Sequence, residues 1–203
     1  FSFSAVPTIA QEDSAREIEE VVITALRKET NLQDTAITIT AITGADLEVK
    51  QIENFEDLQF AVPTLGFAKG AYSGAGITLR GIGNFAVGNS SSASIGYFWN
   101  GQTASSSGLY EQEFFDVERV EVLRGPQGSL FGAGTTGGLI QMITKRPDAE
   151  AGGYLKADIA DYDSLRMEGA VNLPLTDRLR SRFAFASLQR EGFVTNSHTG
   201  NKL

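Results

Sequence analysis

The last third of the chain alternates regularly between apolar and polar residues. YLKADIA places Leu155, Ala157 and Ile159 on one side of an extended chain, and SLRMEGAVNL and LRSRFAFAS repeat the pattern. A period of two predicts β-strands, here three of about ten residues with a short PLTDR turn. Such strands build transmembrane β-barrels, and a soluble antiparallel sheet with one solvent-exposed face gives the same pattern. A barrel needs about eight strands, so the barrel interpretation makes the chain an N-terminal fragment.

A strand and two short helices are predicted ahead of the glycine-rich region. AITITAI, residues 36–42, alternates as a strand does. Thr43 and Asn54 each precede an acidic residue by three positions, which is the spacing of a helix N-terminal cap. We therefore expect helices at about 44–51 and 55–61.

The middle of the chain reads as a compact, turn-rich αβ domain. Of the 22 glycines, 16 lie between Gly66 and Gly138. Four β-like runs interrupt them: GITLRGI, ASIGYFWNG, VERVEVLRG and GLIQMITK. Two polar loops, NFAVGNSSSA and GQTASSSGLYEQ, are expected to join these strands, and no residue from Gly81 to Tyr110 is charged.

The N-terminal region has two parts of different character. Residues 1–10, FSFSAVPTIA, resemble the end of a secretory signal peptide, and the alternative is a frayed apolar terminus. Residues 11–34 are charged and surround IEEVVITAL, whose β-branched side chains favour an extended chain. Such a segment can pair with the edge of another sheet or form the first strand of the domain itself.

Charge and composition exclude several function classes. The net charge of −8 argues against a nucleic-acid partner, which would require a basic face. Cysteine is absent, and the one histidine, His198, lies in a polar NSHTGN stretch, so metal sites and thiol or Ser-His-Asp chemistry find no support. No apolar run is long enough for a membrane-spanning helix. We expect no cofactor, no resident metal and no enzymatic activity.

GAGTTGG is the one motif that suggests a cofactor. Gly132, Gly134 and Gly137 fit the G-x-G-x-x-G spacing of dinucleotide-binding loops, so a soluble αβ nucleotide-binding domain is one alternative. That fold needs a strand directly before the first glycine and a helix after the last. LIQMITK follows instead, and it reads as a strand. A tight turn passing close to other backbone explains the glycines better.

A longer stretch carries a family resemblance. FFDVERVEVLRGPQGSLFGAGTTGGLIQMITKRP resembles the end of the plug domain of TonB-dependent outer-membrane receptors. IEEVVITA is similar to the TonB box, GADLEVKQIENFEDLQFAVPTL to the early plug helices, and ITLRGIGN to the plug's Ile-Arg-Gly strand. Gln141 stands where the family usually has Asn, Ala133 replaces a polar residue, and Asn100 replaces an Asp.

The resemblance implies an α+β plug domain followed by the first strands of a transmembrane antiparallel β-barrel. The expected divisions are a signal-peptide remnant at 1–10, a periplasmic segment with the TonB box at 11–34, the plug at 35–147 and about three barrel strands at 148–203. The location implied is the outer membrane.

The resemblance also implies active uptake of a scarce ligand, with a ferric siderophore as the family's default. The C-terminal domain of TonB would bind the box by strand addition, through the residues Glu19, Glu20, Val21, Val22, Ile23, Thr24 and Ala25. Further expected partners are outer-membrane lipid and a small-molecule ligand that can carry iron, and the complete protein is expected to be a monomer. A non-transporting outer-membrane docking module is a third possibility.

Two sets of site residues follow from the resemblance. Arg80 and Arg124 match plug arginines that face acids on the barrel wall, and the alternative partners are acids of the same domain, such as Glu118 or Glu121. The two polar loops are the candidates for facing the ligand; their residues are Asn84, Phe85, Asn89, Ser90, Trp99, Asn100, Ser106 and Tyr110. Ordinary surface loops, with Trp and Tyr in the core, are the alternative for this second set.

Overall fold

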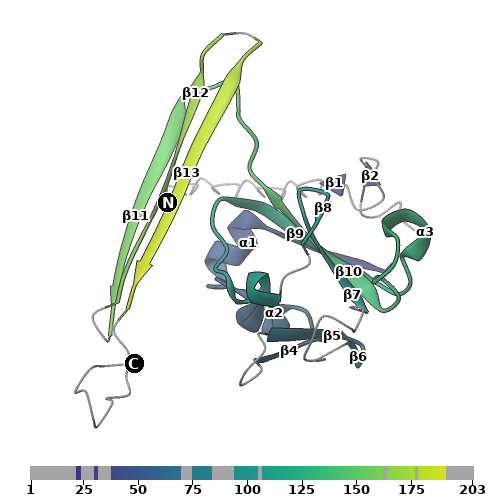
Figure 1. The fold of residues 1–203 in the computed structure, drawn as a ribbon. Coiled ribbons are helices and arrows are strands. Elements are labelled where there is room, and N and C mark those ends of the chain that lie inside the picture. The colour runs from purple at the N-terminus through teal and green to yellow at the C-terminus, as the bar shows by residue number, and fades with distance from the viewer. Residues whose placement is uncertain are drawn as a thin grey trace, which may run out of the picture.

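The computed structural model describes residues 22–23, 30–31, 38–69, 75–83, 94–104, 107–161, 164–176 and 178–190. Figure 1 shows two parts: a globular body, residues 38–147, and a three-stranded sheet that stands beside it, which we call the long sheet. In the described ranges, no helix is both long and apolar enough to cross a membrane.

The body contains a five-stranded sheet in the order β3-β9-β10-β7-β8. Its strands are β3 (Ile39–Thr43), β7 (Ile95–Trp99), β8 (Gln102–Thr103), β9 (Val117–Arg124) and β10 (Gly138–Thr144). β10 pairs antiparallel with β9 and parallel with β7. A smaller sheet contains β4 (Leu65–Lys69), β5 (Ala75–Leu79) and β6 (Ile82–Gly83). A separate pair joins β1 (Val22–Ile23) to β2 (Thr30–Asn31).

The two predicted helices form at their expected positions. α1 spans Gly44–Val49 and α2 spans Phe55–Ala61. The Thr43 hydroxyl accepts from the Asp46 N–H at 3.1 Å while the Asp46 carboxylate accepts from Thr43, which completes the predicted capping box. Both helices pack on one face of the five-stranded sheet. Phe55 forms the centre of this core, with its ring edge-on to Tyr97 at 5.1 Å.

Some short elements were not predicted from the sequence. β4 and β6, the two-residue β8, the 3₁₀ helix η2 (Ser107–Glu111) and the one-turn helix α3 (Gly128–Phe131) are all of this kind. β8 follows β7 through a two-residue turn at Asn100 and Gly101, whose φ angles are 48° and 80°. Positive φ at both positions defines the type I′ hairpin that Asn-Gly favours.

The GAGTTGG stretch belongs to the connection between the antiparallel strands β9 and β10. Gly132 and Gly134 have φ angles of 80° and 89°, and β10 begins at Gly138 directly after the loop. A Cβ at Gly138 would collide with the Leu123 carbonyl oxygen. The helix that a dinucleotide site needs is therefore replaced by a strand, and the nucleotide-binding alternative is wrong. The predicted close approach to another backbone is confirmed at Gly138.

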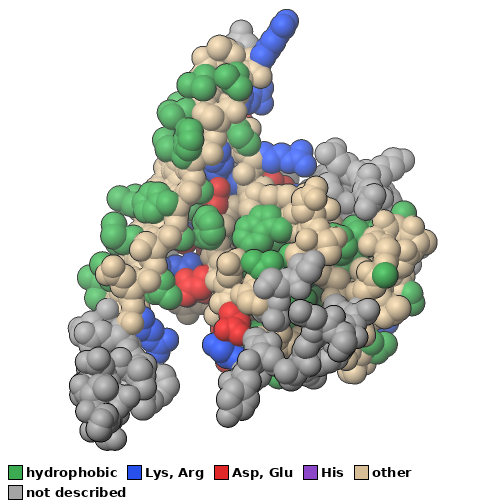
Figure 2. Space-filling view, viewed as in Figure 1, with side chains coloured by type: hydrophobic (Ala, Val, Ile, Leu, Met, Phe, Trp, Pro, Cys, Tyr) green, Lys and Arg blue, Asp and Glu red, His purple; other side chains and the backbone are tan. Residues whose placement is uncertain are grey.

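The long sheet consists of β11 (Gly152–Ala160), β12 (Ser164–Pro174) and β13 (Arg180–Gln189). All three strands were predicted by the alternation. Their apolar residues point away from the body and are exposed, as Leu155, Ile159, Val171, Phe183 and Phe185 are. Figure 2 shows hydrophobic side chains along the outer side of this sheet and charged ones between it and the body. A soluble sheet would bury its apolar face, so this orientation favours barrel strands whose outer face meets lipid.

Replacing Gly138 by Ala tests the close approach. Residue 138 has a φ of 141° and no room for a Cβ, so the substitution should cost about 2–4 kcal/mol in the free energy of unfolding. The measurement is the urea concentration at which residues 38–147 become cleavable in a pulse-proteolysis experiment on the purified protein. Gly152→Ala is the control, since its Cβ would meet nothing within 4 Å, and it should shift that midpoint little. Equal shifts for both variants would contradict the packing argument.

Candidate functional site at the interface with the long sheet

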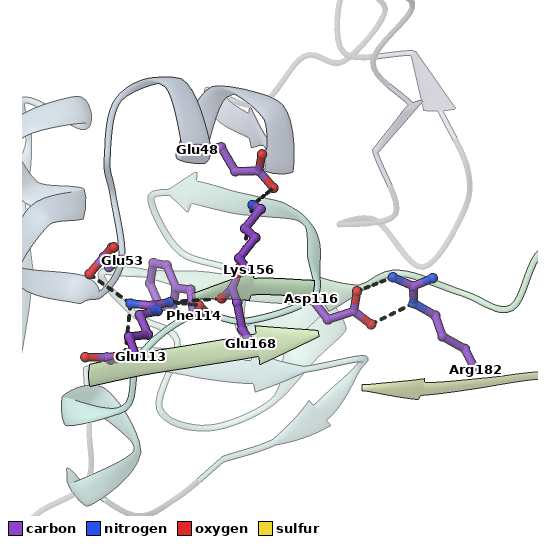
Figure 3. Close-up of polar contacts among 9 residues, drawn as sticks. Glu48, Glu53, Glu113, Phe114, Asp116, Lys156, Glu168 and Arg182 are labelled. Carbon is purple, nitrogen blue, oxygen red and sulfur yellow. Dashed lines mark hydrogen bonds and ion pairs between the residues drawn. The ribbon is translucent and has the colours of Figure 1, made fainter. Parts of the chain in front are cut away.

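Charged side chains from the inner face of the long sheet meet acidic side chains of the body (Figure 3). The basic partners are Lys156 on β11, Arg166 on β12 and Arg182 on β13. Because side chains alternate along a strand, these three share the face opposite the exposed apolar residues. The interface therefore follows from the same period of two that predicted the strands.

Arg166 contacts four groups at once. Its Nη1 lies 2.8 Å from a Glu53 carboxylate oxygen and 2.9 Å from one of Glu113, contacts that are ion pairs rather than aligned hydrogen bonds. Its Nη2 donates to the Phe114 carbonyl and to Glu168, each at 3.2 Å. The Arg166 and Glu168 side chains are nearly buried, at 10% and 11% exposure. A buried guanidinium is tolerated when several acceptors surround it, and these contacts supply them.

The second basic residue, Lys156, makes a more exposed contact. Its Nζ lies 2.9 Å from Glu48 on α1 and 3.5 Å from Glu168 on β12. The Glu48 side chain is more than half exposed. Since solvent screens such a pair, its contribution to stability is small.

The third basic residue, Arg182, makes a bidentate contact. Its Nε donates to Asp116 Oδ2 at 2.7 Å, and its Nη2 donates to the other carboxylate oxygen. Asp116 has a φ of 50° and lies just before β9, where its carbonyl accepts from the Lys145 N–H. Both side chains are mostly buried, so this pair fixes the start of β9 and the end of β10 to β13.

A cavity of about 230 Å³ lies among these groups. Its lining comes from α1, the α1–α2 connection, residues 114–117 and the inner face of β11 and β12. Burial raises the pKa of Glu53 above its usual value, Arg166 opposes that rise, and the neighbouring Glu113 carboxylate adds to it. The cavity is thus polar and is bounded by both the body and the long sheet.

The two predicted plug arginines lie close together at another place in the body. Arg124, at the end of β9, donates to Thr64 at 2.8 Å and to Thr40 at 2.7 Å. Burial lowers its pKa, and the nearby Arg80 lowers it further. Among the described residues, no carboxylate lies within ion-pair distance of either arginine, and Glu118 and Glu121 both contact Arg119 instead. Contact with barrel-wall acids stays a prediction.

Only three of the eight predicted ligand-facing residues lie among the described residues. Asn84, Phe85, Asn89, Ser90 and Ser106 lie outside the described residues. The other three residues make contacts within the body.

Trp99 packs against the main core, and Tyr110 stacks edge-on to Phe55 at 5.7 Å. Asn100 donates to the Thr144 hydroxyl and accepts from the Thr144 N–H, both at 3.0 Å. A ligand-facing role for these three residues stays a prediction.

Asn100 is beside Thr144, the last residue of β10, whereas Ser94 accepts from Gly137 just before β10 begins. The parallel pairing of β7 and β10 therefore places Ser94 and Asn100 at opposite ends of β10.

Most of the predicted TonB-binding segment falls outside the described residues. Val22 and Ile23 form β1, which pairs antiparallel with β2. These two residues are therefore extended, as their β-branched character predicted. Glu19, Glu20, Val21, Thr24 and Ala25 lie outside the described residues, as do residues 1–10.

Sequence reasoning missed the charged interface itself. The alternation indicates that the polar residues of these strands share one face, but it identifies no partners for them. The usable signal was a charged inner face combined with an apolar outer face, because charges on such a face need counter-charges from whatever the sheet encloses.

In the described part of the chain, no group of three or more His, Cys, Asp or Glu residues could hold a metal ion.

A globular αβ body joined by charged side chains to a sheet with an apolar outer face is the arrangement of a plug inside a barrel wall. Comparison with known families agrees: the model of the TonB-dependent receptor plug domain matches residues 31–139. The chain belongs to this family. Its relatives are outer-membrane receptors of Gram-negative bacteria, and this protein shares that location.

Individual relatives support the assignment along most of the chain. The pesticin receptor of Yersinia pestis is 25% identical over 97% of the chain, and the ferripyoverdine receptor of Pseudomonas aeruginosa is 29% identical over 90%. The crystal structure of the ferric yersiniabactin uptake receptor from Yersinia pestis has a TM-score of 0.72 and 26% identity, covering 82% of this chain and 26% of its own. The chain spans 29% and 22% of the length of those two curated relatives.

The Asp116–Arg182 pair yields a prediction. Asp116→Ala leaves a mostly buried Arg182 without its carboxylate and should destabilise the attachment of β9 to the long sheet by about 2–3 kcal/mol. The measurement is again the urea midpoint for cleavage of residues 38–147. The control is Glu111→Ala, because the Lys69–Glu111 pair is largely exposed and should contribute under about 1 kcal/mol. A control effect as large as that of Asp116→Ala would refute a special role for the buried pair.

Proposed function

We propose that this chain is the plug and the first wall strands of a receptor that takes up a scarce ligand across the outer membrane, driven by TonB. The observation that carries the proposal is the two-faced long sheet. Its outer face is apolar and exposed, and its inner face is charged and paired with the body. A wall with these two faces separates lipid from a polar lumen, which is what an outer-membrane transporter requires.

The proposed division of the chain keeps the boundaries expected from the sequence: residues 1–10 for export, 11–34 for the TonB-binding segment, 35–147 for the plug and 148–203 for the start of the wall. The relatives include receptors for pesticin, ferripyoverdine, ferric enterobactin and metal-pseudopaline. A ferric siderophore is therefore the ligand class we propose. The proposed protein is a monomeric transporter with lipid around its wall, and it catalyses no reaction.

The proposed TonB contact is strand addition to residues 19–25. Its support is the extended conformation of Val22 and Ile23 and the resemblance of this segment to a TonB box. A pull on this segment would reach the body first at β3, an edge strand of the five-stranded sheet. An edge strand is held by one neighbour, so it yields more readily than a central strand.

Deleting residues 19–25 tests energised transport. The variant of the complete receptor should bind a ferric siderophore as the wild type does and lose its uptake, because binding needs no energy and transport does. The probes are iron-55 complexes of yersiniabactin and pyoverdine, measured for binding on cells without a proton-motive force and for accumulation with one. A deletion of the same length at residues 11–17 is the control. Binding without energised accumulation by the wild type would favour a non-transporting docking module, and equal loss of binding and uptake would contradict the segment's assignment.

The lipid-facing surface gives a separate prediction. Phe185 is half exposed near the middle of β13, so Phe185→Arg should oppose membrane insertion by about 2–4 kcal/mol if the residue lies at the bilayer midplane. The measurement is the amount of heat-modifiable, folded receptor in outer-membrane fractions. Ser187→Arg, nearer the end of the strand, should have a smaller effect. No loss of folded receptor in the Phe185 variant would contradict a lipid-facing surface here.

A further inference from the structure

The Arg166 side chain lies where two separate segments of the body meet. One segment is the α1–α2 connection with Glu53, and the other comes just before β9 with Glu113 and Phe114. The segments are joined directly by the Phe114 N–H, which donates to the Glu53 carbonyl at 2.6 Å. One side chain of the wall therefore contacts both sides of a junction that is formed by residues 61 positions apart.

The carboxylates at this junction need the positive charge of Arg166 as a counter-charge. Glu53 and Glu113 approach the same guanidinium nitrogen, and the Glu113 carboxylate raises the electrostatic cost of ionising Glu53. Glu168 adds a third carboxylate to the same guanidinium. Without Arg166 the junction would carry adjacent like charges, which solvent screens at the half-exposed Glu53 and less well at the nearly buried Glu168.

The junction also borders the cavity of about 230 Å³ between the body and β11–β12. Arg166, Glu53, Phe114 and Glu168 are all part of its lining. Movement of the junction away from β12 would enlarge this cavity. The contacts of Arg166 thus hold together the two surfaces that border this partly open cavity.

We propose that Arg166 is a positioning residue that fastens the Glu53–Phe114 junction to the wall and keeps a passage along β11 and β12 closed until the body is remodelled. This rests on the proposed transport function. A guanidinium suits the role because it contacts separate acceptors through different nitrogens, whereas an ammonium is a single point charge. The neighbouring Lys156–Glu48 pair lies on the same side and is too exposed to close the passage alone.

The polarity of this contact is opposite to that of the predicted plug arginines. Here the wall supplies the base and the body supplies the acids, whereas Arg80 and Arg124 place bases on the body. The contact is thus a distinct attachment, and it can be tested without altering Arg80 or Arg124.

The test is leakage through the complete receptor in cells that lack TonB. Vancomycin, which is too large for general porins, is the probe, and its minimal inhibitory concentration is the measurement. Arg166→Met should make cells about tenfold more sensitive, because removing the nearly buried guanidinium leaves Glu53, Glu113 and Glu168 without their shared counter-charge. Arg166→Lys should be intermediate. Arg178→Met is the matched control, since Arg178 is exposed at the β12–β13 turn, and it should behave as the wild type.

Two further comparisons make the result decisive. Folded receptor is quantified by heat-modifiable migration, and equal amounts with equal vancomycin sensitivity in the Arg166→Met and Arg178→Met strains would overturn the proposal. If Arg166→Met lowers the amount of folded receptor, leakage is measured instead in a double variant, Glu53→Gln with Glu113→Gln. This variant leaves the wall sequence unchanged. Leakage in this double variant supports the proposal and its absence overturns it.

The leakage assay also separates this proposal from the transport function. Leakage uses no siderophore and no TonB, so it is independent of energised uptake. A leaky Arg166→Met strain together with a wild type that accumulates no iron-55 siderophore would refute the transport proposal and leave the role of Arg166 standing. An Arg166→Met strain that does not leak, together with a wild type that accumulates the iron-55 siderophore, would refute the role of Arg166 alone.

Discussion

The structure depends on one electrostatic constraint: charges on the inner face of a lipid-facing sheet need partners from the lumen. The long sheet exposes Phe183 and Phe185 outward, so its alternate positions, among them Arg182, must point inward. Moving these charges to the outer face would place them in lipid, where each would cost several kcal/mol. The body supplies carboxylates at the positions where the wall presents Lys156, Arg166 and Arg182. Register within the sheet and docking of the body are thereby tied to the same alternation.

Local chemistry made much of the fold predictable. The caps at Thr43 and Asn54 fixed the starts of both helices because a cap involves residues only three positions apart. The period of two marked the three long strands for the same reason, since it is a local property. The Asn100–Gly101 hairpin carried an equally local signal, but the sequence reading treated Asn100 as a departure from a family pattern. The structure shows that both residues have the positive φ that a type I′ turn requires.

The pairings at the interface could not be predicted from the sequence because they join residues that are far apart in the chain. Arg166 lies 113 residues from Glu53 in the chain, and neither residue is marked by a motif. The alternation shows that Arg166 faces inward and leaves open which of 25 acidic residues it meets. The same limit applies to the parallel pairing of β7 and β10, which joins Ile95 to Gly138. Aromatic residues such as Tyr110 were ambiguous because a loop position and a core position look alike in one sequence.

The body carries charges of opposite sign at the two ends of β9, and this arrangement constrains how the body can sit in a closed wall. Asp116 precedes β9 and Arg124 ends it, so the two lie about 25 Å apart along one strand. The Asp116 end meets basic side chains of β11–β13, whereas Arg124 and Arg80 have no carboxylate partner among the described residues. Rotating the body by half a turn would bring Arg124 toward Arg166 and Arg182 and leave like charges facing each other in a poorly screened space. A wall that is basic on β11–β13 and acidic elsewhere would therefore accept the body in one orientation, and complementary charge, more than shape alone, would specify that orientation.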